Sequence, residues 1–280
     1  MTDDVLELVL ANNYAQNRIL SDERHLAPVF LPAHRRLIEA LERAGQLDRD
    51  LEALPTDAEL DRRARDGAGL TTPELSMLLA HAKISLARSV IASDLPDEPW
   101  VREILRGYFP RELRERFGDH LGEHPLRREI VATVLVNTVV DLGGITFAHR
   151  ALEETGCDPA DVVRAAVVAD RVFGLSDLTA RVSGLDGQVP AAVATELRQE
   201  QRRLLDRTVR GLLERRGRPV DVLGETRRFA ATVAAYADTV PGLLRGQDRE
   251  YVDTLVARFT TAGVGEAAAQ RTAGLLYVFP

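Results

Sequence analysis

The sequence contains very little cysteine and lysine, and little that a secreted or nucleic-acid-binding protein needs. Cys157 is the single cysteine among 280 residues, which excludes an intrachain disulfide framework and a cysteine-rich zinc site. Lys83 is the only lysine, and the net charge of -7 argues against a dedicated nucleic-acid binder. The first ten residues carry acids where a secretion signal needs basic residues. We therefore expect a cytoplasmic protein.

Long uninterrupted apolar runs are scarce as well. The most apolar window, residues 130–148, is interrupted by Asn137, Asp141, three threonines and a glycine pair. A membrane span would not normally contain such an interruption. We therefore expect no membrane span.

Helical periodicity recurs along the whole chain, and no convincing hairpin or alternating strand is present. A chain of 280 residues that is 45% hydrophobic can bury a sizeable core. The pattern predicts an all-α fold, a multi-helix orthogonal or bundle-like array. Residues 1–280 form one helical region, which can divide into a core lobe (1–184) and a helical-hairpin lobe (190–280) at the linker GLDGQVP (184–190).

The most informative stretch is the central helix predicted over residues 127–142. Pro125 suits a first helical turn, and Gly143-Gly144 suits a C-terminal cap. About sixteen residues are too many for a strand, which usually has about 5–6. Because apolar residues leave almost no polar face, this helix should be buried nearly all round.

Other helices are predicted on each side of the central one. The first should cover residues 3–20, with Val5, Leu6, Val9, Leu10 and Ile19 facing inward, and a second should cover 33–44. The spacing of Thr56 and Glu59 predicts a capping box, and Thr72-Pro73 should open a helix that ends near Ser93. Further helices are expected at 100–109, 158–173 and 251–261, and a C-terminal αα-hairpin is expected from 191–216 and a returning helix marked by Phe229, Val233, Tyr236 and Val240.

Two short motifs imitate known sites. His120, Glu123 and His124 match the H-x-x-E-H pattern of zinc peptidases, but Gly122 and Pro125 predict a loop where the motif needs a helix. Residues 263–268 (GVGEAA) imitate a dinucleotide fingerprint, yet no strand precedes them, which predicts a turn between helices. We therefore expect no catalytic, cofactor-binding or metal-binding residue in this chain.

Three polar features are open to more than one interpretation. Thr133, Asn137 and Asp141 share one face of the central helix. They are interpreted as a structural hydrogen-bond network or, alternatively, as a ligand site, and His149 and Arg150 could complete either. Lys83 is interpreted as an exposed or snorkelling residue and not as a catalytic amine. Eight arginines, interleaved with acids, lie from Arg198 to Arg218. They are interpreted as a solvated face or a docking surface for an acidic partner, and alternatively as a basic helix that follows nucleic-acid phosphates.

Several long segments resemble the large-subunit, NAD-specific glutamate dehydrogenases of bacteria. They are LVLANNYAQNRILS (8–21), GLTTPELSMLLAHAKISL (69–86), SDLPDEPW (93–100), YFPRELRERFG (108–118), HPLRREIVATVLVNTVVDLGGITFAHRALEETG (124–156) and VFGL (172–175). Their order is similar to the region that follows the catalytic domain of that family. The resemblance implies a parent enzyme that oxidatively deaminates L-glutamate to 2-oxoglutarate and ammonium with NAD⁺.

The family's active-site lysines, proton-transfer acid and nucleotide-binding domain have no counterpart in this chain, and one lysine cannot replace several. The resemblance therefore implies a C-terminal scaffolding, regulatory or assembly portion, with the catalytic domain before Met1 and more helical sequence after Pro280. Its partners would be that catalytic domain, with residues 3–20 packed against it, and further subunits of a homo-oligomer. The alternative is a free-standing interaction module that uses the Arg198–Arg218 face, and a metallohydrolase is a distant third.

The absence of reactive groups generates a direct prediction. The purified 280-residue chain should be strongly helical by circular dichroism and should give no glutamate-dependent reduction of NAD⁺, measured by absorbance of the reduced nucleotide. Appreciable turnover by a preparation free of other dehydrogenases would refute the assignment of the chemistry to another part of the parent protein.

Overall fold

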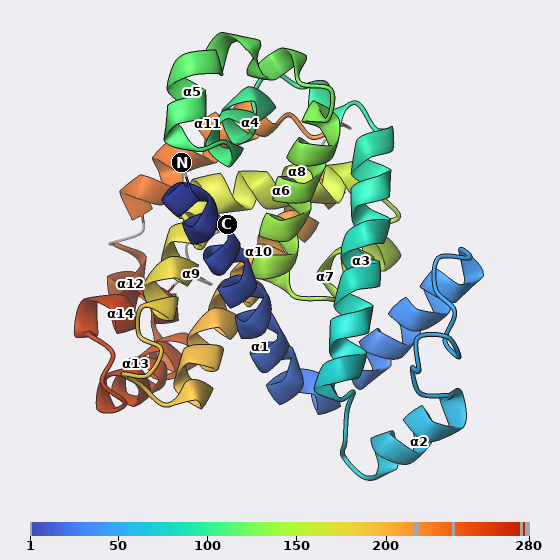
Figure 1. The fold of residues 1–280 in the computed structure, drawn as a ribbon. Coiled ribbons are helices and arrows are strands. Elements are labelled where there is room, and N and C mark those ends of the chain that lie inside the picture. The colour runs from blue at the N-terminus through green and yellow to red at the C-terminus, as the bar shows by residue number, and fades with distance from the viewer. Residues whose placement is uncertain (1, 216–218, 237–238, 275–276, 278–280) are drawn as a thin grey trace. The chain divides into compact units, whose positions relative to one another are not determined.

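A computed structural model describes the chain except residues 1, 216–218, 237–238, 275–276 and 278–280 (Figure 1). Across the described residues the secondary structure is helical, and the only β-type pairing there is an isolated bridge between Asp186 and Val189. The predicted all-α class is confirmed. The elements are α1 (Thr2–Arg43), α2 (Asp57–Arg65), α3 (Thr72–Ala92), η1 (Leu95–Asp97), α4 (Val101–Tyr108), α5 (Arg111–Phe117), η2 (Gly118–Glu123), α6 (Arg127–Gly143), α7 (Phe147–Thr155), α8 (Pro159–Phe173), α9 (Leu175–Ser183), α10 (Ala191–Arg215), α11 (Val222–Tyr236), α12 (Val240–Leu243), α13 (Gly246–Thr261) and α14 (Glu266–Gly274).

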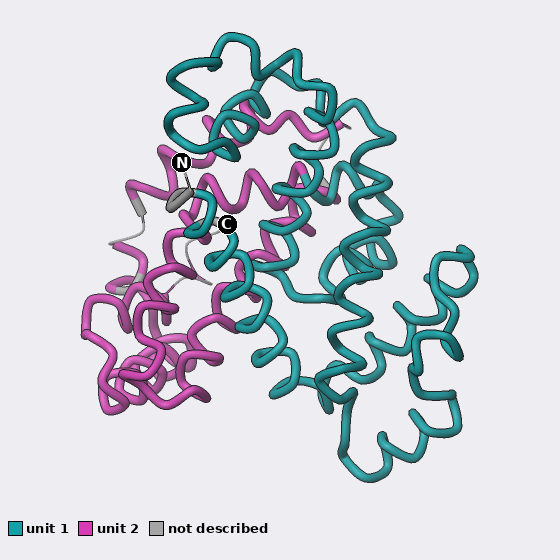
Figure 2. The backbone as a smooth tube through the Cα atoms, viewed as in Figure 1, with its two compact units in different colours: residues 1–163 teal, residues 164–280 magenta. Residues whose placement is uncertain are grey.

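The chain forms two compact units, residues 1–163 and 164–280 (Figure 2). The division falls inside α8, earlier than the 184–190 segment in which the sequence places a linker. That segment lies within the second unit, and its Val189 belongs to that unit's hydrophobic core together with Val182 and Leu197. Its apolar side chains therefore join neighbouring helices into one unit.

The core of the first unit is built where α3 packs against both α1 and α6. The central helix α6 begins and ends within one residue of its predicted bounds, and most of its apolar side chains are buried. The polar side chain of Thr133 on the same helix is exposed. Side chains with almost no solvent contact fill this core: Ile19, Ile38, Leu60, Leu70, Leu75, Leu78, Leu95, Leu135 and Phe147.

The first helix corrects the sequence-based prediction of two helices over 3–20 and 33–44. A single helix, α1, runs through both segments, although Pro28 and Pro32 lie inside it. An internal proline lacks the N–H that would bond to the carbonyl four residues earlier. The spacing of four residues puts both prolines on one face of the helix, and that face is exposed. Water can therefore satisfy the freed carbonyls, while Leu31, Leu37 and Ile38 bury the opposite face. Figure 1 shows α1 bending partway along, as internal prolines generally cause.

Leu60 is the only buried residue of α2, so apolar packing contributes little to holding this helix. Charged side chains hold it in place instead. Arg63 on α2 donates two hydrogen bonds, of 2.6 and 2.9 Å, to Glu74 on α3. Arg35 on α1 reaches Asp61 of α2 at 2.7 Å. The hydrogen bond from Arg49 lowers the pKa of Asp57 at the start of α2. Bidentate arginine pairs of this kind give orientation as well as energy.

The starts of α2 and α3 are encoded locally and fall where the sequence predicts them. Thr56 caps α2, and its Oγ1 accepts the Glu59 backbone N–H at 3.3 Å. The other half of the predicted capping box is not formed, because the Glu59 carboxylate accepts hydrogen bonds from Arg62 and Arg63 instead. α3 begins at Thr72 with Thr71 as its cap, and Glu74 accepts a hydrogen bond from the Thr71 backbone N–H at 2.7 Å. The prediction that Thr72-Pro73 opens a helix ending near Ser93 is confirmed, and a capping box that was not predicted from the sequence precedes it.

Two glycines turn the chain sharply between α6 and α7, which meet at 88°. Gly144 has φ +87°, in the region that favours glycine. A Cβ on Gly143 would lie 2.4 Å from Cγ of Phe147, so only a hydrogen fits there. The predicted role of the glycine pair in ending the central helix is confirmed, and the Phe147 ring supplies the reason.

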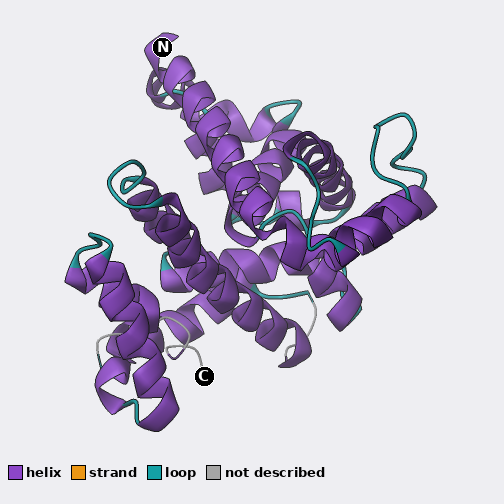
Figure 3. Ribbon diagram, turned by 90° about the horizontal axis from the view of Figure 1, so that it is seen from below, coloured by secondary structure: helices purple, strands orange, loops and turns teal. Residues whose placement is uncertain are grey.

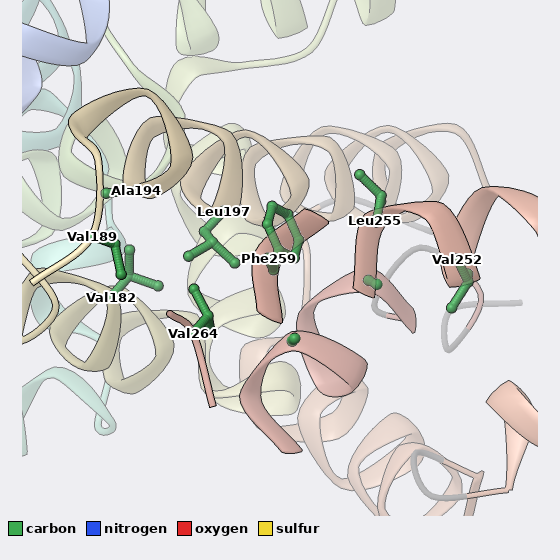
Figure 4. Close-up of a cluster of buried hydrophobic side chains, with 10 residues drawn as sticks. Val182, Val189, Ala194, Leu197, Val252, Leu255, Phe259 and Val264 are labelled. Atoms are coloured by element: carbon green, nitrogen blue, oxygen red, sulfur yellow. The ribbon is translucent and has the colours of Figure 1, made fainter. Parts of the chain in front are cut away.

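The second unit has its own core, made by α9, α10, α13 and α14 (Figure 4). Phe259 on α13 is fully buried and lies close to Leu197 of α10 in the close-up. The described residues of this unit are helix and loop, as Figure 3 shows for the rest of the described chain. The predicted helix over 191–216 is observed as α10, while the Gly217-Arg218 turn of the predicted hairpin lies outside the described residues.

By length and composition α3 could cross a membrane, and α6 with α7 would also pass if the bent pair counted as one span. Core helices of proteins without a membrane segment meet the same criteria. In this structure α3 buries Leu75, Leu78 and Val90 and contacts α1 and α6. Packing inside the first unit thus accounts for part of its apolar composition, while 28% of its most apolar window is buried and Ile84 is 48% exposed.

The α6–α7 turn generates a prediction about stability. Gly143→Ala should lower the free energy of unfolding by about 1–3 kcal/mol, since the added methyl overlaps the buried Phe147 ring. Gly107→Ala is the matched control, because its Cβ would meet nothing within 4 Å in α4. Alanine should there be neutral or stabilising by about 0.5 kcal/mol. Urea unfolding followed by circular dichroism measures both, and equal effects of the two substitutions would contradict the packing account.

Candidate docking surface

The first turns of α1 leave several large apolar side chains about half exposed. Val5 is 47% exposed, Leu6 55%, Val9 49% and Leu10 57%, and Tyr14 continues the same surface. We call these five residues the α1 apolar face. Contiguous apolar surface on a helix is typical of an interaction site.

This face corrects one expectation and bears on another. Of the five side chains predicted to face inward, only Ile19 is buried, while Val5, Leu6, Val9 and Leu10 are not. The i, i+4 spacing that suggested a core-facing stripe is present, but these side chains stay about half exposed. The weaker prediction, that residues 3–20 pack against another domain, stays a prediction and is compatible with this exposure.

The polar face of α6 meets the chain's only lysine. The Nζ of Lys83 on α3 lies 3.8 Å from Oδ1 of Asp141, and both side chains are mostly buried. Burial lowers the pKa of Lys83 and raises the pKa of Asp141, and each shift is partly offset by the opposite charge of the other. Arg18 on α1 also acts on Asp141. The sequence suggested an exposed or snorkelling Lys83. The structure shows instead that Lys83 is mostly buried and paired with Asp141.

The rest of the predicted polar face does not form one network. Thr133 is exposed and donates to the Glu129 carbonyl at 2.7 Å, a bond within its own helix. Asn137 is half-buried between Thr133 and Asp141. Only Asp141 has a charged partner on another helix, so the cross-helix interaction is an ion pair joining α3 and α6.

His149 and Arg150 interact elsewhere. Nε2 of His149 lies 3.4 Å from Glu153 on its own helix, and Arg36 of α1 donates to the same carboxylate at 3.1 Å. Burial lowers the pKa of His149. Arg150 stacks over the Phe30 ring, 5.6 Å from its centre. These contacts tie α7 to α1 and do not complete a ligand site with Asp141.

The H-x-x-E-H residues lie at the end of η2, a short 3-10 helix, where the sequence predicted a loop. His120 and Glu123 are largely exposed, with 3.6 Å between Nδ1 and Oε2. Nδ1 of His124 accepts the Leu126 backbone N–H at 3.1 Å and is thereby engaged within the turn. Among the described residues no group of three or more histidine, cysteine or acidic side chains is arranged to hold a metal ion.

The glycine-rich segment 263–268 joins α13 to α14, as a turn between helices. Gly263 adopts φ +99° to make that turn. The helix Gly246–Thr261 occupies the place of the strand that a dinucleotide fingerprint requires. The interpretation as a helix–helix turn is confirmed.

The arginines of α10 are largely paired within their own unit. Arg203 lies 2.6 Å from Glu200, which is itself buried, and the Tyr251 hydroxyl donates to the same carboxylate at 3.2 Å. Arg198 is buried beside Asp186, and Arg210 is 3.9 Å from Asp206. Arg216 and Arg218 lie outside the described residues. This pairing favours a solvated and structural face over a surface for an acidic partner.

The geometry thus describes an all-helical region whose described part carries ion pairs and an apolar helix face. Comparison with known proteins supplies the family. The family model described as "Glutamate dehydrogenase, C-terminal" matches residues 67–280. The chain therefore belongs to the glutamate dehydrogenase C-terminal family.

Three relatives share nearly the whole chain, and each is named NAD-specific glutamate dehydrogenase. The chain is 42% identical over 277 residues to the protein from Mycobacterium tuberculosis. It is 39% identical over 279 residues to that from Halomonas elongata, and 38% identical over 279 residues to that from Pseudomonas aeruginosa. The alignments cover 99–100% of this chain but 17% of each relative. The chain thus spans about 17% of the length of these relatives.

The Lys83–Asp141 pair generates a prediction. Lys83→Met leaves Asp141 mostly buried without its ammonium partner and should cost about 2 kcal/mol of stability at pH 7. In the double variant Lys83→Met/Asp141→Leu, most of that loss should be regained, because no charge remains buried. Urea unfolding of the parent chain and both variants measures this coupling.

The same single variant has a pH signature. Losing Lys83 raises the pKa of Asp141 further above its value in the unfolded chain, so the folded state binds the proton more tightly. Its deficit should be small below about pH 4, where Asp141 is protonated in both states, and grow as the pH rises to neutrality. Equal losses in the single and double variants, or a deficit independent of pH, would contradict a coupled pair.

Proposed function

We propose that this chain is the helical C-terminal portion of an NAD-specific glutamate dehydrogenase and that the α1 apolar face docks it on the catalytic domain of the same polypeptide. The parent enzyme would oxidatively deaminate L-glutamate to 2-oxoglutarate and ammonium, with NAD⁺ as the hydride acceptor. The chain would contribute scaffolding, regulation or subunit assembly. A cytoplasmic location and a homo-oligomeric parent, both expected from the sequence, are part of the proposal.

The observation that carries the docking proposal is the position of the exposed face. The match to the C-terminal family begins at residue 67, whereas the relatives align over 99–100% of the chain, so α1 is shared with the relatives but precedes the family match. A helix gains most of its stability from packing an apolar face. The side chains of the α1 apolar face are about half exposed, which supports a partner elsewhere in the longer polypeptide.

The free-standing interaction module is the second candidate. It relies on the arginines of α10, several of which are already paired with acids of their own unit. The family match favours the first candidate. A coding sequence that continues upstream into a dehydrogenase domain supports the first, and a start codon with a ribosome-binding site at Met1 supports the second.

The docking proposal predicts the effect of charge on the α1 apolar face. Leu6→Asp/Leu10→Asp should weaken binding of this chain to the separately produced catalytic portion by at least about tenfold in Kd, since two leucines lose their burial. Isothermal titration calorimetry measures the change. Circular dichroism checks that each variant remains helical.

Val29→Asp/Leu51→Asp is the matched control, because these side chains are 76% and 79% exposed and lie outside the α1 apolar face. It adds the same charge and removes similar apolar surface, and it should bind like the parent chain. If the Leu6→Asp/Leu10→Asp variant binds as tightly as the control, the proposed docking surface is wrong.

A further inference from the structure

A cavity of about 660 Å³ lies between η1, α4, η2 and the start of α6 in the first unit. Its volume falls in the range of sites for small organic ligands. The floor is apolar, since Val101, Leu105, Leu121 and Val131 are all buried. The rim is charged. No aromatic side chain is among its lining residues, so there is no platform for stacking a flat ring.

Two of the rim's positive charges stand on one face of one helix. Arg102 and Arg106 are four residues apart on α4, so their side chains are neighbours. Both line the cavity and both are exposed. Within the described chain neither guanidinium has a hydrogen-bonding or ion-pair partner. Gly118 and Gly122 line the cavity as well and add no side-chain bulk beside these guanidinium groups.

Most of the other charges at the rim are already engaged. Asp97 accepts hydrogen bonds from both Arg127, at 2.6 Å, and Arg128. Those two bonds lower the pKa of Asp97, which therefore stays a carboxylate. Glu98 accepts the indole N–H of Trp100. The lining carries three carboxylates, on Asp97, Glu98 and Asp119, and three arginines, and of these arginines Arg102 and Arg106 are the two without an acidic partner in the described chain.

We propose that this cavity binds a small aliphatic dicarboxylate. Its carboxylates would accept hydrogen bonds from Arg102 and Arg106, whose planar guanidinium groups match a carboxylate in a bidentate arrangement. Its methylene chain would lie on the floor made by Val101 and Leu105. The lack of an aromatic wall favours an aliphatic ligand over a nucleotide. This site is independent of the α1 apolar face, so either proposal can fail without the other.

The test uses the 280-residue chain and three probes of increasing length, malonate, succinate and glutarate. At least one should raise the melting temperature saturably and give a measurable Kd by isothermal titration calorimetry at constant ionic strength. Acetate and inorganic phosphate at the same ionic strength should shift the melting temperature less, because neither carries two carboxylates on an aliphatic chain.

Arg102→Gln/Arg106→Gln should raise the Kd of the best dicarboxylate by about tenfold or more, the effect expected when charge-assisted hydrogen bonds are lost. Arg65→Gln/Arg88→Gln is the control, since it removes the same charge from two exposed arginines that do not line the cavity. It should leave the Kd unchanged. If no dicarboxylate binds, if the Arg102/Arg106 variant binds as well as the control, or if phosphate or acetate acts equally, the proposal is wrong.

Discussion

Burial of a helix that is apolar on most of its surface organises the first unit. Because α6 has few polar positions, it can be stable only where other helices remove it from water. α3 packs along it and α1 packs along α3. The turn that follows α6 has to be sharp, and Gly143 and Gly144 make it possible, one by leaving room for Phe147 and the other by its positive φ.

Charge is the second organising influence, and it is almost entirely arginine chemistry. Ion pairs from Arg63, Arg35 and Arg49 hold the small helix α2. Its single buried side chain, Leu60, gives it little apolar packing. The one lysine sits instead at the α3–α6 interface, where a mostly buried ammonium faces Asp141. Pairing limits the cost of burying either charge, which neither side chain alone could bear without a large pKa shift. The rim of the η1–α4–η2 cavity differs because two of its guanidinium groups remain unengaged.

Some features of the fold and of its candidate sites could be predicted from the sequence, and others could not. Family-specific segments identified the chain, and the glycine turns of 143–144 and 263–268 could be predicted because glycine conformations are local. The path of α1 could not, since the usual effect of Pro28 and Pro32 is overridden by burial of the opposite helix face. The partner of Asp141 was also out of reach, because Lys83 is distant in sequence. The cavity between α4 and η2 has no sequence signature, as it depends on how four short elements pack.

The sequence by itself determined the helical class, most helix ends and the family, since periodicity, caps and turn residues act over a few neighbouring positions. Tertiary structure alone decided which apolar stripe is core and which is surface. Val5 and Leu75 occur in equally helical patterns, yet one is exposed and the other fully buried. The physical reason is that periodicity defines a face of a helix, while only the packing of other helices determines whether that face meets water or protein.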